Sequence, residues 1–278
     1  IIRALHPNSF IEDPTRIYRA VRFAVRLGFT LDSTTEQWIR AAVASGLHDA
    51  VGGDRLKQEL AYIFGSRDWP QAFERLAEWG ALRCIHPDLE WDPSLCRRLQ
   101  RVGRWAYHFR RRYPELGSQE IWQLRLEALL LTLPQAPQVA SQLHLTQAGV
   151  ERLSQFPHYQ TLLAQLNSGS LSPAQVVQRL QGLRIPAVIL LASLADKPAR
   201  RLIWRYLQEW HWVKPLLNGH DLRRLGYRPG RSFQAILEQL RCLTLNGELT
   251  TPAEAEAWLQ EHFPLPQAQP SGRPNQSK

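Results

Sequence analysis

The chain has 278 residues and is basic, with 34 Lys and Arg against 25 Asp and Glu, which gives a formal net charge of +9. Hydrophobic residues make up 44% of it and charged residues 21%, values typical of folded domains that exclude intrinsic disorder for most of its length. Its apolar runs fall far short of the about 20 residues of a membrane-spanning helix and no signal-like segment opens the chain, so we expect neither a membrane protein nor a secreted one.

Nearly every segment repeats its apolar residues at helical rather than strand spacing, and Gly, Pro and Ser separate helices of ordinary length. The predicted fold class is therefore all-α. Most of the predicted helices open at a proline or at a capping side chain. Their predicted starts lie near Pro14, Ser33, Asp54, Trp69, Pro93, Ser118, Thr146, Ser172, Pro186, Pro198, His220, Arg231 and Pro252.

The first predicted helix begins at Pro14, with Asp13 as its N-cap, and stops at Gly28. On a helical wheel, four arginines share one stripe while apolar residues fill another face. No acidic residue lies between Thr15 and Leu31 to relieve the repulsion among them, so the stripe is expected to bind an anion. The four residues are Arg16, Arg19, Arg22 and Arg26.

At the entrance of this helix, Glu12 and Asp13 place carboxylates beside Arg16. A carboxylate only accepts hydrogen bonds and a guanidinium only donates them. C and A present an amino group beside an acceptor ring nitrogen, whereas G and U present a carbonyl in place of the amino group. Asp13 and Arg16 together are therefore expected to select C and A. The alternative role of Asp13 is a plain helix cap, and we expect capping to remain its second duty.

These residues resemble the EDxxR motif of the class II tRNA nucleotidyltransferases, the family of CCA-adding enzymes and bacterial poly(A) polymerases. The resemblance implies an elongated, all-helical neck, body and tail behind an N-terminal catalytic head. It places Mg²⁺ and its ligands in that head, so no catalytic or metal-binding residue is expected here. Because the sequence opens at Ile1 rather than Met, we expect a part of a longer protein. The matching runs are Glu12-Asp13-Pro14-Thr15-Arg16, Arg19-Ala-Val-Arg22-Phe-Ala and Leu27-Gly28-Phe29.

The same resemblance implies a role for each residue of the motif. Asp13 and Arg16 would face the base of the incoming CTP or ATP, and Glu12 would hold Arg16. Arg19 and Arg22 would complete the nucleotide-binding surface. The implied reaction adds C and/or A to the 3′ end of tRNA, with ATP and CTP as substrates and tRNA as partner. The alternatives are a bacterial poly(A) polymerase and a non-catalytic helical RNA-binding protein.

Residues 53–60 resemble the family's second neck motif, in which an arginine at a helix start and a later glutamate support the first helix. From spacing alone, Arg55 and Glu59 are interpreted as an ion pair within one helix, because they lie four residues apart. Pro and Gln dominate the end of the chain, which predicts disorder there. The predicted domains are a neck over 1–66 that binds the nucleotide base and RNA, a body over 67–165, a tail over 166–263 and a disordered end over 264–278.

A second basic segment, 97–113, contains seven arginines and interleaved aromatic residues but no acidic residue. A solvated helix face is one interpretation. Arginine also pairs bidentately with phosphate, and the local positive charge is unbalanced, so contact with an RNA backbone is predicted. The predicted RNA-binding residues are Arg97, Arg98, Arg101, Arg104, Arg110, Arg111 and Arg112.

The three cysteines indicate the cellular compartment. Cys84, Cys96 and Cys242 are an odd number without a close pair, which favours neither a disulfide framework nor a zinc site. Reduced thiols are expected, and with them a cytoplasmic location. The sequence gives no indication of the oligomeric state.

Overall fold

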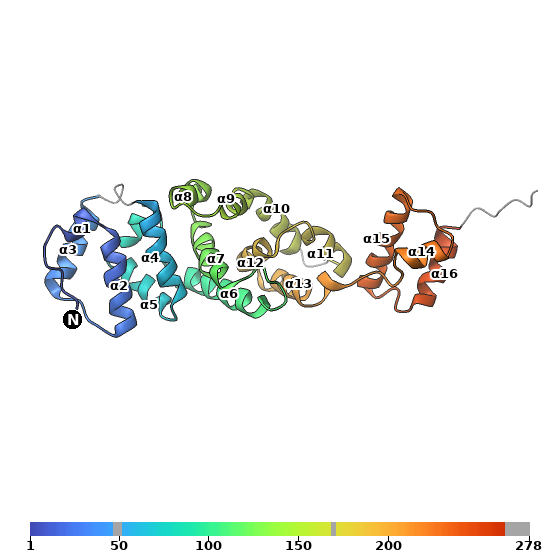
Figure 1. Ribbon diagram of the computed structural model, residues 1–278, viewed down its shortest axis with the longest axis horizontal. Helices are drawn as coiled ribbons and strands as arrows, with labels where there is room; N and C mark the ends of the chain where they lie inside the picture. The colour runs from blue at the N-terminus through green and yellow to red at the C-terminus, as the bar shows by residue number, and fades with distance from the viewer. Residues whose placement is uncertain (47–51, 168–170, 265–278) are drawn as a thin grey trace, which may run out of the picture. The chain divides into compact units, whose positions relative to one another are not determined.

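The computed structural model describes residues 1–46, 52–167 and 171–264. In these ranges the chain forms helices and one isolated β-bridge, between Ile2 and Leu31, which confirms the all-α prediction. The chain divides into two compact units, whose helices are drawn in Figure 1. Unit 1 comprises residues 1–169 and 183–201, and unit 2 comprises residues 170–182 and 202–278.

Unit 1 is a stack of helices in which segments distant in sequence pack together. Helix α2 packs on α4 and α5, α4 also packs on α7, and α6 packs on α7 and α12. The bounds are α1 Ser9–Glu12, α2 Thr15–Leu27, α3 Ser33–Ala44, α4 Gly53–Gly65, α5 Trp69–Glu78, the 3₁₀-helix η2 Ala81–Cys84, α6 Pro93–Phe109, α7 Ser118–Leu130, α8 Ala136–Gln142, α9 Gln147–Ser154, α10 Phe156–Asn167 and α12 Ile185–Leu194.

The core of unit 1 follows from the apolar faces of these helices. Helix α12 is apolar on all sides, and every residue from Ile185 to Ser193 is buried. Between α4 and α5, Phe64 stacks on Phe73 with ring centroids 4.6 Å apart, and Phe73 stacks on Trp91 at 5.2 Å. Rings in offset contact bury large apolar areas, so this cluster fixes α5 against α4.

Unit 2 has a separate core made by α14, α15 and α16. Capping boxes begin two of these helices: Asn218 with Asp221 at α14, and Thr251 with Glu254 at α16. Each box satisfies backbone N–H groups that a helix start leaves open. The bounds are α11 Pro173–Leu180, η3 Trp210–Trp212, α14 Gly219–Arg224, α15 Arg231–Asn246 and α16 Pro252–His262, and α13 Lys197–Gln208 begins in unit 1 and ends in unit 2.

All thirteen predicted helix starts lie within one residue of an observed one. Three α-helices, α1, α8 and α10, were not predicted. The predicted domain boundaries at 66/67 and 165/166 stay predictions, because the two compact units divide the chain differently from a three-domain scheme. The predicted disorder of 264–278 lies, except for Pro264, outside the described residues.

In the described part of the chain, no single helix is both long and apolar enough to cross a membrane. Among the described helices, one consecutive pair, α11 and α12, meets that test together by length and composition, with a bend of 117° between the two helices.

Candidate functional site

The site begins at the corner between α1 and α2. Asp13 has an extended backbone (φ −148°, ψ 92°), whereas Pro14 already has helical dihedral angles (φ −61°, ψ −20°). The Asp13 Oδ1 atom accepts hydrogen bonds from the Thr15 backbone N–H at 3.1 Å and from the Thr15 hydroxyl at 2.5 Å. The Asp13 side chain thus bonds to the first residue of α2, as a capping role requires, but the helix starts one residue later than predicted and Pro14 rather than Asp13 is at the N-cap position. Gly28 ends the helix with φ +66°, a left-handed conformation that favours glycine.

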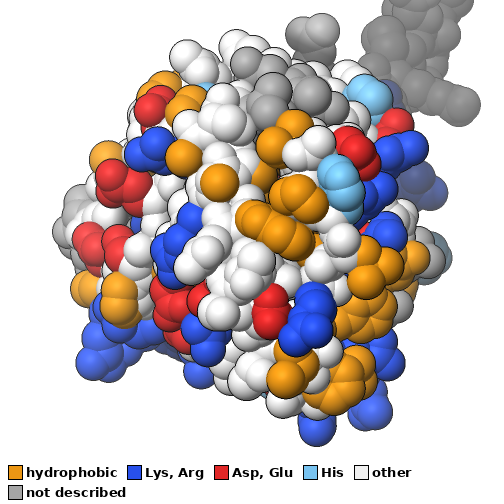
Figure 2. Space-filling view, turned by 90° about the vertical axis from the view of Figure 1, so that its left-hand side faces the viewer, with side chains coloured by type: hydrophobic (Ala, Val, Ile, Leu, Met, Phe, Trp, Pro, Cys, Tyr) orange, Lys and Arg blue, Asp and Glu red, His pale blue; other side chains and the backbone are white. Residues whose placement is uncertain are grey.

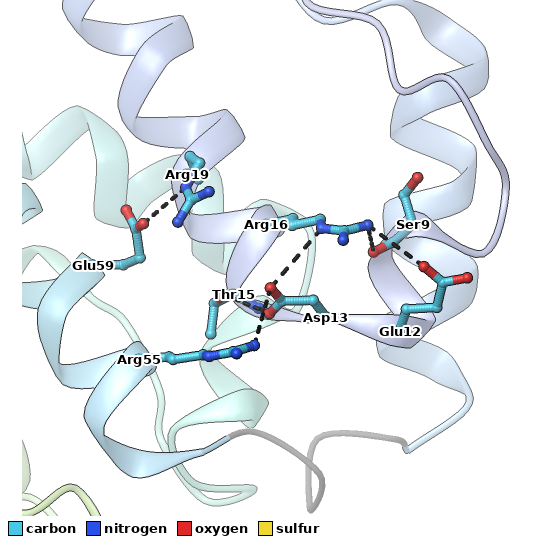
Figure 3. Close-up of polar contacts among 8 residues, drawn as sticks. All are labelled: Ser9, Glu12, Asp13, Thr15, Arg16, Arg19, Arg55 and Glu59. Carbon is cyan, nitrogen blue, oxygen red and sulfur yellow. Dashed lines mark hydrogen bonds and ion pairs between the residues drawn. The ribbon is translucent and has the colours of Figure 1, made fainter.

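Arg16 lies beside Asp13 and is fixed by groups from α1, as Figure 3 shows. Its Nη1 donates to the Ser9 carbonyl at 3.1 Å and lies 3.7 Å from a Glu12 carboxylate oxygen. Its Nε lies 3.9 Å from Asp13 Oδ2. The structure therefore brings together Glu12, Asp13 and Arg16, and Glu12 lies where it can hold the arginine.

One oxygen of Asp13 remains available as an acceptor. Within the described part of the chain Oδ2 accepts no hydrogen bond, since its contacts with Arg16 and with Arg55 Nη1 are ion pairs at 3.9 and 3.7 Å. Arg16 Nη2 likewise donates no hydrogen bond to a described residue. The site presents an open acceptor next to an open donor.

Arg19 and Arg22, on the next turns of α2, share a single carboxylate. Glu59, on α4, is only 3% exposed and accepts from Arg19 Nε at 2.9 Å and from Arg22 Nε at 3.0 Å. The anion that the arginine stripe was expected to bind is thus, for these two residues, a side chain of the same protein. Glu59 supports the first helix, as the resemblance implies.

The predicted ion pair between Arg55 and Glu59 is wrong. Arg55 pairs with Asp13, and Glu59 pairs across to α2 (Figure 3). The i,i+4 spacing permitted a pair within α4, but Glu59 faces the packed side of the helix while Arg55 is exposed at its start. A buried carboxylate needs close cationic partners, and Arg19 and Arg22 supply them.

The two arginines differ in how accessible they are. The Arg19 side chain is 55% exposed, and its two terminal nitrogens have no contact with a described acidic residue. The Arg22 side chain is 15% exposed and lies over the rings of Phe23 and Tyr62 at 4.6 and 5.0 Å. Arg19 can still reach a ligand, whereas Arg22 is held mainly by the protein.

The surface near this corner also exposes apolar side chains. Figure 2 shows the end of unit 1 with α1 and α3, where hydrophobic side chains gather among basic and acidic ones. Such a group of exposed apolar side chains is typical of a contact surface. Six large hydrophobic residues of the first 29 are exposed: Ile1, Leu5, Ile11, Phe23, Leu27 and Phe29.

The predicted RNA-binding arginines lie on α6 and just after it. Arg97, Arg104, Arg111 and Arg112 are exposed, whereas Arg98, Arg101 and Arg110 are half-buried. Arg101 donates to the Ser193 carbonyl at 3.0 Å. Burial first, and then neighbouring arginines including Arg200 and Arg104, lower the pKa of Arg101. After burial, the second cause is thus positive charge crowded along this side of α6.

No group of three or more His, Cys, Asp or Glu side chains able to hold a metal ion occurs among the described residues. Glu12 and Asp13 each face an arginine, which occupies the charge that a cation would need. The residues of the site therefore do not fit a magnesium ion.

Comparisons with known protein families, sequences and solved structures show which proteins this chain resembles. Residues 28–92 match a family model described as the probable RNA and SrmB-binding site of polymerase A. The A-adding tRNA nucleotidyltransferase of Geobacter sulfurreducens is 33% identical over 269 residues, which cover 90% of this chain and 29% of the relative. The chain thus spans less than a third of that relative's length.

Solved structures share the fold. The Thermotoga maritima CCA-adding enzyme complexed with tRNA superposes with a TM-score of 0.76 at 23% identity, over 94% of this chain and 63% of the other. A CCA-adding enzyme in complex with CTP gives a TM-score of 0.72 at 22% identity, over 94% of this chain and 62% of the other. These matches confirm the resemblance found in the sequence: the chain is similar to part of the class II tRNA nucleotidyltransferases, and it shares the fold of the solved structures.

Sequence reasoning missed some residues that build the site. The Ser9 carbonyl holds Arg16, and Arg55 reaches Asp13 from α4. A backbone carbonyl has no signature in sequence. Arg55 has a sequence signature, because it lies at the start of a helix that carries a buried glutamate. Its partner Asp13, however, lies 42 residues earlier in the chain, and spacing within α4 cannot show that pairing.

Proposed function

We propose that this chain is the base-selecting and RNA-holding part of a tRNA nucleotidyltransferase that adds C and/or A to the 3′ end of tRNA. The observation that carries this proposal is the open acceptor on Asp13 Oδ2 beside the open donor on Arg16 Nη2. The similarity to relatives named A-adding tRNA nucleotidyltransferases supports it and makes A addition the first activity to test.

The base of CTP or ATP is the group that this arrangement fits. Its exocyclic amino group would donate to Asp13 Oδ2, and its neighbouring ring nitrogen would accept from Arg16. G and U would place a carbonyl against the carboxylate, where two acceptors repel. Glu12 and the Ser9 carbonyl hold Arg16, so the donor is in place before the nucleotide arrives.

Arg19 supplies positive charge for the triphosphate through the nitrogens that Glu59 leaves open, while Arg22 keeps Glu59 and α4 in register with α2. The arginines of α6 hold the tRNA backbone. The carboxylates that bind Mg²⁺ lie, in this proposal, in a part of the longer protein outside this chain. When bound there, the metal would activate the RNA 3′-OH and stabilise the leaving pyrophosphate.

The test is nucleotide choice by the full-length protein carrying Asp13→Asn. Asparagine is as good a helix cap as aspartate, so the variant keeps the fold. Its amide can also turn a donor toward G or U. We expect the preference for C or A over G and U to fall by about 5- to 150-fold. Incorporation efficiencies of the four nucleotides are measured beside the melting temperature.

Asp13→Ala serves as the second variant and Arg16→Ala as the third. Both should lose selectivity, and Asp13→Ala should also lose about 0.5 to 2 kcal/mol of stability through the missing cap. If Asp13→Asn keeps the parental preference, the carboxylate is only a cap and the base-selecting role is wrong. Processive addition of many A residues by the parental protein would instead identify a poly(A) polymerase.

A further inference from the structure

Unit 1 contains a cavity of about 830 Å³ away from the α1–α2 corner. It lies between the end of α4, the start of α5 and the facing sides of α6 and α7. Cavities of this size accommodate ligands as large as a nucleotide. The residues that matter for its chemistry are Arg67, Trp69, Arg104, Tyr107, Arg111 and Arg125.

The lining of this cavity is positively charged and unbalanced. Five arginines contribute to it, and none of them has a carboxylate within ion-pair distance among the described residues: Arg67, Arg104, Arg110, Arg111 and Arg125. Like charges gathered in one concavity raise the local concentration of anions. An anionic ligand would relieve their repulsion.

Arg125 forms a fixed part of the wall. Its Nη1 donates to the Phe64 carbonyl, its guanidinium carbon lies 5.2 Å from the ring centre of Trp69, and its buried Nε has no hydrogen-bond partner in the described structure. Burial lowers the pKa of this arginine. The Nε atom is inaccessible because it lies against Gly103, so Arg125 contributes its fixed positive charge to the wall, which favours an anionic group such as a phosphate.

Gly103, on α6, makes room for that arginine. A Cβ atom at Gly103 would lie 2.3 Å from Arg125 Nη2 and 2.8 Å from its Cζ, closer than real Cβ atoms approach other atoms. The absence of a side chain at this position therefore lets the guanidinium lie against the helix. The positive charge is held in place rather than free to move.

An aromatic ring lies beside the charge. Tyr107 is 60% exposed, and Arg110 covers one face of its ring at 3.7 Å. Aromatic rings and guanidinium planes are the surfaces on which unpaired bases stack, whereas a duplex offers only phosphates and groove edges. A flat exposed ring inside an arginine-lined cavity thus matches both halves of a nucleotide.

We propose that this cavity binds one nucleotide unit, with its phosphate on Arg125 and the neighbouring arginines and its base stacked on Tyr107. The source is an unpaired nucleotide of an RNA strand. This rests on the proposed function, in which the chain holds tRNA, and adds to it a site that takes a single base out of its stack. Arg97, Arg98 and Arg101 lie outside the cavity and serve the backbone only.

The test uses this chain and three probes: a six-nucleotide oligouridylate, the same backbone without bases, and UMP. Uridine is chosen because Asp13 and Arg16 are expected to reject it, whereas stacking accepts any base. We expect the oligouridylate to bind at least fivefold more tightly than its abasic counterpart. Tyr107→Ala should abolish that ratio, and Tyr107→Phe should keep it.

Two further variants separate charge from stacking. Gly103→Ala should displace Arg125 and weaken both hexamers, and Arg97→Ala should weaken both only slightly and leave the ratio unchanged. If tRNA binds but Tyr107→Ala leaves the ratio unchanged, the cavity proposal is wrong and the proposed function stands. If no RNA binds at all, both fail. Binding of UMP as tight as that of the hexamer would assign the cavity to a free nucleotide and overturn the RNA source.

Discussion

Glu59 is the residue on which the arrangement of the candidate site depends most. It is nearly inaccessible, and its two oxygens accept one charge-assisted hydrogen bond each, from Arg19 and from Arg22. Such bonds are short and strong, and here both cross from α4 to α2. A residue that touches no nucleotide in the proposed function therefore positions Arg19, the arginine proposed to contact the triphosphate.

Glu59→Gln should show this. A glutamine can accept only on one side, so one arginine of α2 loses its partner, and we expect the free energy of unfolding to fall by about 1.5 to 3 kcal/mol. Urea denaturation measures the change. Glu78→Gln is the matched control, since Glu78 pairs with Arg75 on the surface and should cost under about 1 kcal/mol. Equal losses in both variants would contradict the structural role given to Glu59.

Cys84 should make the protein sensitive to alkaline pH. Burial raises the pKa of its thiol from 9.0 to about 11. Because the folded-state pKa is the higher one, the contribution to stability is fully present below about pH 9 and is lost as the pH rises through about 11. We expect the melting temperature to decline more steeply over this range in the parental protein than in Cys84→Ala. Parallel profiles would show that the thiol titrates as it does in the unfolded chain.

At the scale of elements, helix α6 depends on its first turn. Asp92 accepts a hydrogen bond from the Leu95 N–H at 2.7 Å, and Pro93 occupies the first helical position. That backbone bond is the first cause of a lowered pKa for the Asp92 carboxyl. The helix carries the predicted RNA-binding arginines, so its start decides how well they are ordered.

Asp92→Ala should lower the free energy of unfolding at neutral pH by about 0.5 to 2 kcal/mol. A carboxyl whose folded-state pKa is depressed stabilises the fold above its unfolded value of 3.8 and stops doing so as the pH falls through the folded value. The gap between variant and parent should therefore narrow below about pH 3.8. Asp88→Ala, at an exposed loop position, is the control and should change little at any pH.

At the scale of the whole molecule, the charge of +9 predicts salt-dependent binding of RNA. Arg97→Ala and Arg104→Ala each remove one cation that is expected to neutralise a phosphate, so each should reduce the slope of log affinity against log salt by somewhat under one. The affinity for tRNA is measured at several salt concentrations. Arg75→Ala removes the same charge from an arginine already paired with Glu78 and should leave the slope unchanged. An unchanged slope in all three variants would show that this part of α6 is a solvated helix face that does not contact RNA phosphates.

The fold was largely predictable because residues close in sequence determine where its helices begin and end. Prolines, capping side chains and Gly28 act over one turn, and the predicted starts follow from them. Helix α8 was not predicted, although a proline lies in its first turn. The site was predictable where its residues adjoin, as for Glu12, Asp13 and Arg16. The prediction of ion pairs failed where the partners come from distant segments, as for Glu59. Pairing across helices depends on packing, which no spacing rule encodes.

The shared carboxylate of Glu59 also constrains how the protein can change over generations. Loss of Glu59 first would leave Arg19 and Arg22 without their shared carboxylate. Loss of either arginine first would leave the buried Glu59 with a single cationic partner. Either single step is unfavourable, so stepwise replacement is slow. Positions 19, 22 and 59 are therefore expected to covary, and a comparison of many related sequences should find them either all retained or exchanged as a set.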